Sequence, residues 1–138
     1  MRFAKTVLKA TLVATALATA GLVQAKDLTI GLVLSVSGPF ADYGKQIKHG
    51  IDLYMAGHGD TVAGRKVKLI VKDDTGMAPQ VAKRVAQELL VNDKVDILAG
   101  FDLTPNAFSA APLAAQGLVA VYVVNAAASS VTEKSPYI

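Results

Sequence analysis

The chain has 138 residues, which is the length of a single domain. It contains no cysteine, which excludes a disulfide scaffold, a thiolate metal site and a cysteine nucleophile. Its formal net charge is +3, and whether this indicates a nucleic acid or an anionic membrane as partner depends on where the positive charges lie.

The first 25 residues have the pattern of a secretory signal peptide. A basic segment without acidic residues contains Arg2, Lys5 and Lys9, and a run of apolar or small residues, 10–23, follows it. The segment ends at Ala25, with small residues where a signal peptidase would cleave. This run is shorter than the roughly 20 residues that a membrane-spanning helix needs, and an uncleaved anchor is the alternative interpretation. A lipoprotein is excluded because lipidation needs a cysteine. We expect a cleavable signal over residues 1–25 and a periplasmic location.

Cleavage after Ala25 changes the charge argument. The signal carries three of the basic residues, so the remaining chain has 11 basic and 11 acidic residues and a formal net charge of zero. The main argument for nucleic acid or anionic lipid as partner therefore disappears.

Residues 26–138 alternate between strand and helix patterns. The continuous apolar run 28–34 (LTIGLVL) is typical of a buried parallel strand. The same criteria predict strands over 65–72, 95–99 and 118–124, and helices over 42–56, 79–92 and 104–117. We expect Pro112 to kink or shorten the last helix. This order predicts an α/β fold with a parallel sheet and helices on both faces.

Ligands of such sheets bind beyond the carboxyl ends of the strands. The segments that follow the predicted strands are 35–44, 73–76, 100–105 and 125–130. These four loops are therefore the place to look for a functional site.

Catalytic motifs are absent from the sequence. It has no phosphate-binding loop, no dinucleotide fingerprint and no serine nucleophile elbow. The only histidines, His49 and His58, are expected at the surface, so we expect no metal site. We also expect that the protein needs no cofactor and is not an enzyme. The pair Asp73–Asp74 follows a strand and could hold magnesium, but a turn that caps the next helix is the favoured interpretation.

Donors and aromatic side chains remain as candidates. Thr104 at a predicted helix start is suited to an anion, Ser129 and Ser130 add hydroxyl donors, and Phe40 and Tyr43 can form a pocket wall. Taken singly, each has an ordinary explanation as a helix cap, a loop residue or a surface aromatic. Their common place at one edge of the sheet favours a binding site.

An ordered set of short motifs carries a family resemblance. The motifs are Ile30-Gly31, Ser37-Gly38-Pro39-x-Ala41-x-Tyr43-Gly44, Gly50-Ile51, Lys72-Asp73-Asp74, Gly100-x-x-x-Thr104, Ala126-Ala127-Ala128-Ser129 and Ser135-Pro136-Tyr137. Over residues 27–138 the chain resembles the start of a type I periplasmic solute-binding protein of the leucine/isoleucine/valine-binding family of ABC transporters.

The resemblance implies a two-lobed clamshell that closes on a small solute and delivers it to an inner-membrane permease. The implied solute is a branched-chain amino acid or a similar small carboxylate or amide. Carried onto this chain, the ligand-binding positions are Tyr43, Thr104, the backbone carbonyl of Ala127 and the hydroxyl of Ser129. These donors and carbonyls suit a carboxylate and an ammonium group.

Two departures from the family matter. Phe101 and Asp102 lie beside Thr104, where they are expected to alter the shape or charge of the pocket. Members of the family are much longer, so we expect residues 26–138 to be most of the first lobe, without the second lobe and without tight solute binding of its own.

Two other classes of function stay open. A secreted α/β enzyme would need a nucleophile with its base, or a metal site, and the sequence shows neither. A ligand-sensing domain of a receptor can share the fold, although a transcription regulator would begin with a DNA-binding helix pair rather than an export signal.

Overall fold

The computed structural model describes residues 26–117 and 119–138, and the predicted export signal, residues 1–25, lies outside the described residues. The elements are β1 (Leu28–Leu34), α2 (Ala41–His58), β2 (Thr61–Val62), β3 (Arg65–Asp73), α3 (Pro79–Val91), β4 (Ile97–Gly100), α4 (Thr104–Gly117), β5 (Val121–Val123) and the 3-10 helix η1 (Ser129–Lys134). The predicted alternation of strands and helices is confirmed.

The strands form one sheet in the order β2-β3-β1-β4-β5. The central strand β1 pairs in parallel with β3 and β4, and β4 pairs in parallel with β5. The two-residue β2, which the sequence did not predict, adds an antiparallel hairpin to this otherwise parallel sheet. Its turn passes through Ala63 and Gly64 with φ angles of 50° and 75°, the left-handed pair that tight hairpins favour.

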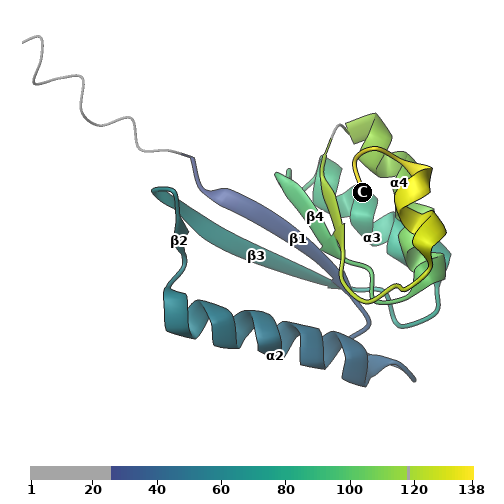
Figure 1. The fold of residues 1–138 in the computed structure, drawn as a ribbon, viewed down its shortest axis with the longest axis horizontal. Helices are drawn as coiled ribbons and strands as arrows, with labels where there is room; N and C mark the ends of the chain where they lie inside the picture. Colours follow the sequence, from purple (N-terminus) through teal and green to yellow (C-terminus); the bar gives the residue numbers. More distant parts are fainter. Residues whose placement is uncertain (1–25, 118) are drawn as a thin grey trace, which may run out of the picture.

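Helices cover both faces of the sheet, as the sequence predicts. Figure 1 shows α2 on one side and α3, α4 and η1 on the other. Because side chains alternate along a strand, β1 serves both faces. Gly31 lies against Leu89 of α3, whereas Leu28 and Ile30 face α2.

The hydrophobic core lies between the sheet and the pair α3–α4. Its fully buried side chains include Val33 of β1, Leu89 of α3, Leu98 of β4 and Phe101. On the other face the packing is looser, because an apolar cavity of about 230 Å³ remains between α2 and the strands. The core side is therefore the rigid part on which the loops of the carboxyl edge rest.

Some boundaries differ from the prediction. Strand β5 is shorter than the apolar run 118–124, because the Val119 N–H still donates to the Ala114 carbonyl at the end of α4. Helix α4 ends at Gly117, as predicted, so Pro112 does not shorten it. No helix among residues 26–117 and 119–138 is long and apolar enough to cross a membrane.

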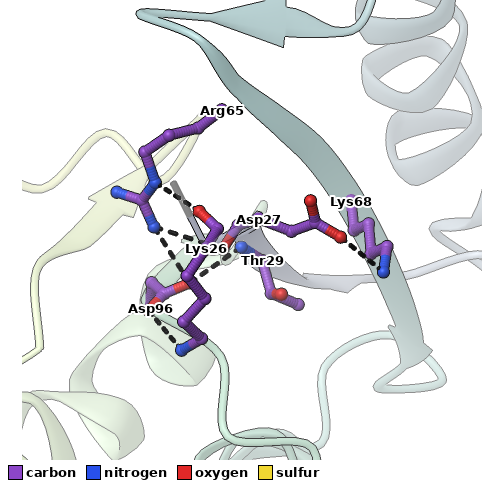
Figure 2. A network of polar contacts seen from close by, with 6 residues as sticks. All are labelled: Lys26, Asp27, Thr29, Arg65, Lys68 and Asp96. Atoms are coloured by element: carbon purple, nitrogen blue, oxygen red, sulfur yellow. Dashed lines mark hydrogen bonds and ion pairs between the residues drawn. The ribbon is translucent and has the colours of Figure 1, made fainter. Parts of the chain in front are cut away.

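A network of charged groups fastens the start of the domain at the amino ends of the strands (Figure 2). Asp96 accepts a hydrogen bond from the Thr29 N–H at 2.9 Å and lies 3.2 Å from the Lys26 ammonium. The Arg65 guanidinium donates to the Lys26 carbonyl at 2.7 Å. The bond from Thr29 lowers the pKa of Asp96, partial burial opposes this, and Lys26 and Arg65 lower it further. The network thus fixes Lys26, the residue that follows the predicted cleavage point, to the start of the sheet.

Candidate functional site

The carboxyl ends of four strands meet at one edge of the sheet. Leu34 of β1 lies opposite Asp73 of β3, and Gly100 of β4 lies opposite both Val33 and Val123. The four predicted loops therefore begin side by side, and this part of the sequence prediction is confirmed. All candidate binding residues belong to these loops or to the helices that follow them.

Tyr43 lies in the first turn of α2 with 48% of its side chain exposed. Its ring stacks on Phe40, with 6.1 Å between the ring centroids and 17° between the planes. Both rings line a cavity of about 390 Å³ together with Pro39, Asp42 and Gln46. Tyr43 is thus one wall of an open aromatic pocket. The other three predicted binding residues, Thr104, Ala127 and Ser129, do not line it.

Thr104 is the first residue of α4, at the helix start that the sequence predicts. The N–H groups of Asn106 and Ala107 both donate to the Leu103 carbonyl at 3.1 Å, and Pro105 has no N–H. The donors left at this helix start are the N–H and hydroxyl of the half-buried Thr104, which have no partner among the described residues. The anion site predicted here therefore depends on Thr104 itself.

Ala127 and Ser129 follow β5 and are both exposed. Ser129 begins η1, where its carbonyl accepts a hydrogen bond from the Thr132 hydroxyl at 3.0 Å. The segment after β5 thus places Ala127 and Ser129 at the same edge of the sheet as Thr104.

Asp73 shapes the loop that leads to Tyr43. Its carboxylate accepts hydrogen bonds from the N–H groups of Val36 and Thr75, at 3.0 and 2.9 Å, and from the Ser37 hydroxyl. Partial burial alone would raise the pKa of Asp73, but these hydrogen bonds outweigh it and hold the pKa below its usual value. Asp73 acts as a cap of the loop after β1 and of its own turn. The prediction that the Asp73–Asp74 turn caps the next helix is wrong, because the start of α3 has no side-chain cap and Asp74 is buried against Ser35 and Asn106.

Sequence reasoning missed a buried polar cluster directly behind these loops. Ser35, Asp74, Asp102 and Asn106 are each at most 1% exposed. The Ser35 hydroxyl lies 2.8 Å from Asp74 and 3.0 Å from Asp102, and the Asn106 amide donates to Asp74 at 2.8 Å. Asp102 was expected to change the charge of the pocket, but it turns inward to Ser35. The available signal was a polar residue directly after a buried apolar strand, as in Leu34-Ser35.

An open α/β sheet whose candidate residues gather at the carboxyl edge is the architecture of a small-ligand-binding domain. The sequence profile of the family described as "Periplasmic binding protein" matches residues 27–138. The chain belongs to this family, as the resemblance implied.

Similar proteins share this assignment. Leu/Ile/Val-binding protein homolog 6 of Brucella abortus (strain 2308) is 43% identical over 119 residues, which cover 86% of this chain and 30% of the relative. A solute binding protein of an ABC transporter from Rhodopseudomonas palustris BisB5, solved in complex with 3,4-dihydroxybenzoic acid, is 51% identical with a TM-score of 0.79. The match covers 81% of this chain and 31% of that one.

A second solved protein is the solute binding protein of an ABC transporter from Rhodopseudomonas palustris HaA2, in complex with p-hydroxybenzoic acid. It is 46% identical with a TM-score of 0.78, over 83% of this chain and 31% of that one. The chain thus spans about 30% of the length of the relatives it matches.

Proposed function

We propose that residues 26–138 provide the first lobe of a periplasmic receptor for an ABC importer and that its carboxyl edge binds a small carboxylate solute. The observation that carries the proposal is the strand register, which starts the loops of Tyr43, Thr104, Ala127 and Ser129 side by side. A second lobe would close over this edge, and an inner-membrane permease would receive the solute.

We favour an aromatic carboxylate as the solute. Two solved relatives, 51% and 46% identical, hold hydroxybenzoic acids, and the stacked rings of Phe40 and Tyr43 supply a matching wall. The carboxylates of Asp74 and Asp102 turn into the protein, so they are not presented to an ammonium group. A branched-chain amino acid is the second candidate, supported by the name of the Brucella relative.

Titration calorimetry on the protein expressed from its complete gene tests the solute class. We expect 4-hydroxybenzoate to bind at least about tenfold more tightly than L-leucine, because a site built to stack a ring loses that contact with an aliphatic solute. Tighter binding of L-leucine would contradict the aromatic assignment and support the second candidate. If neither solute binds, the carboxylate proposal fails.

Thr104→Ala tests the role of the helix start. Loss of a hydroxyl that donates to a carboxylate costs about 1.5–3 kcal/mol, so we expect 4-hydroxybenzoate affinity to fall about 10- to 100-fold. The matched control is Thr61→Ala, which removes an exposed hydroxyl in β2, opposite Lys66 at the amino end of β3. Equal affinity of the Thr104→Ala variant and the control would contradict the assignment.

The export proposal is tested on the periplasmic fraction of a Gram-negative host. The Arg65 guanidinium donates to the carbonyl of Lys26, the residue after the predicted signal, so this residue is part of the fold. We expect intact-mass and N-terminal analysis to find a chain that begins at Lys26. Recovery of an unprocessed chain in the cytoplasm would contradict cleavage after Ala25.

A further inference from the structure

The buried cluster of Ser35, Asp74, Asp102 and Asn106 contains two carboxyl groups and no balancing positive charge. The carboxyl groups come from the ends of β3 and β4, and Ser35 comes from the end of β1 between them. No Lys or Arg of the described residues forms a hydrogen bond or an ion pair with Asp74 or Asp102. Burying two negative charges without a cation would cost much free energy. The question is therefore which of the two carboxyl groups carries a proton.

Asp74 accepts hydrogen bonds on both of its carboxyl oxygens. Its Oδ1 accepts from the Ser35 hydroxyl at 2.8 Å and from the Gly76 N–H at 3.1 Å. Its Oδ2 accepts from the Asn106 amide at 2.8 Å, and the other hydrogen of that amide goes to the Gly76 carbonyl at 2.7 Å. Three donors thus converge on the Asp74 carboxyl group, and none of these hydrogen bonds needs a hydrogen on Asp74 itself.

The Asp102 carboxyl group has fewer hydrogen-bond donors around it than Asp74. Its Oδ2 lies 3.3 Å from the Ser35 N–H, and its Oδ1 lies 3.0 Å from the Ser35 hydroxyl oxygen. A serine hydroxyl has a single hydrogen, which it cannot give to both carboxyl groups at once. If that hydrogen goes to Asp74, the close contact with Asp102 requires a hydrogen on Asp102.

We propose that Asp102 is protonated and donates to the Ser35 hydroxyl, which donates to an ionised Asp74, and that this chain of hydrogen bonds is a positioning device for the solute loops. The reverse assignment, with the proton on Asp74, would leave Asp102 charged with only two donors, the Ser35 hydroxyl and the Ser35 N–H at 3.3 Å. Burial raises the pKa of Asp102, the Asp74 carboxylate raises it further, and the hydrogen bonds from Ser35 only partly oppose this. Asn125 faces only the backbone of Asp102 and adds no charge.

The cluster joins all the loops of the carboxyl edge. Ser35 belongs to the loop after β1, Asp74 to the loop after β3 and Asp102 to the loop after β4. The Asn125 amide, after β5, donates to the Asp102 carbonyl at 2.9 Å, and Asn106 ties α4 to Asp74. A role in solute binding rests on the function proposed above, whereas the protonation of Asp102 does not.

Asparagine variants separate the two carboxyl groups. In Asp102→Asn the amide NH₂ donates to Ser35 as the protonated acid does and the amide oxygen accepts from the Ser35 N–H, so we expect folding at pH 7 with a folding equilibrium constant within about threefold of the wild type or higher. In Asp74→Asn the new amide NH₂ would point at a group that itself donates a hydrogen bond to Asp74. We therefore expect the folding equilibrium constant of this variant to fall about tenfold or more. Asp52→Asn, at an exposed helix position paired with Lys48, is the control.

The dependence of stability on pH distinguishes a protonated Asp102 from one that only packs in the cluster. A carboxyl whose pKa is raised in the folded protein adds stability below its unfolded value of 3.8 and loses this contribution as pH rises through the folded value. In denaturant titrations from pH 4 to 9, the wild type should therefore lose stability relative to Asp102→Asn as pH rises. A wild type and Asp102→Asn with parallel profiles, or an Asp102→Asn loss equal to that of Asp74→Asn, would overturn the assignment.

Two further measurements keep the proposal open to refutation. The ¹³C signal of the Asp102 carboxyl, identified by its loss in Asp102→Asn, should be that of a protonated acid at pH 6; an ionised signal overturns the proposal even if Asp74→Asn fails to fold. The affinity for 4-hydroxybenzoate should fall with rising pH in the wild type and not in Asp102→Asn. If the affinity depends on pH equally in both proteins, the positioning role is wrong. The protonation of Asp102 is then still tested by the stability measurements, which need no solute.

Discussion

Gly44→Ala is expected to destabilise the protein by about 3 kcal/mol, although the substitution adds only one methyl group. Gly44 is buried in the first turns of α2, and a Cβ there would lie 2.1 Å from the Ser35 carbonyl oxygen and 2.6 Å from its carbon. Both atoms belong to the backbone, so neither can rotate away. Relief requires moving α2, which carries Tyr43, away from the end of β1, which carries Ser35.

Gly50→Ala is the matched control in the same helix. A Cβ at Gly50 meets nothing within 4 Å, and alanine is the better helix former, so this variant should gain about 0.4–1 kcal/mol. Denaturant unfolding of both variants measures the difference. Two variants of equal stability would show that α2 does not press against Ser35 as the structure describes.

The sequence was informative about the order of elements and the edge at which a ligand binds. The apolar run Leu28–Leu34 predicted the buried central strand because a strand covered on both faces has no polar side. The place of Tyr43 and Thr104 followed from topology alone, since parallel strands bring their carboxyl ends to one edge.

Other features depend on contacts that no local pattern contains. Strand β2 is two exposed residues long and exists because it pairs with Arg65 and Lys66. The partnership of Ser35, Asp74 and Asp102 joins residues 39 and 67 positions apart, so only the assembled sheet reveals it.

Phe101→Ala is the second variant with a large expected effect. Among the residues that the structure describes, Phe101 is the largest fully buried side chain, and it packs in the core between the sheet and the pair α3–α4. Truncation of a buried phenylalanine costs about 3–5 kcal/mol, from lost apolar burial and from the cavity that remains. The expected loss in unfolding free energy is in that range.

The backbone at Phe101 allows a sharper test than truncation alone. Its φ angle is +56°, in the left-handed region that disfavours side chains, and Gly100 before it has φ +105°. This bend directs Phe101 into the core and lets Asp102 turn toward Ser35. Since glycine adopts this conformation without penalty, Phe101→Gly should be about 1 kcal/mol more stable than Phe101→Ala.

Leu89 in α3 provides the opposite case. It is equally buried, but its backbone is helical, where glycine is about 1 kcal/mol worse than alanine. Leu89→Gly should therefore be less stable than Leu89→Ala, which reverses the order expected at Phe101. The same order of glycine and alanine at both positions would mean that the bend after β4 is not left-handed. The path by which Asp102 reaches Ser35 would then be different, and with it the arrangement of the loops that carry Thr104.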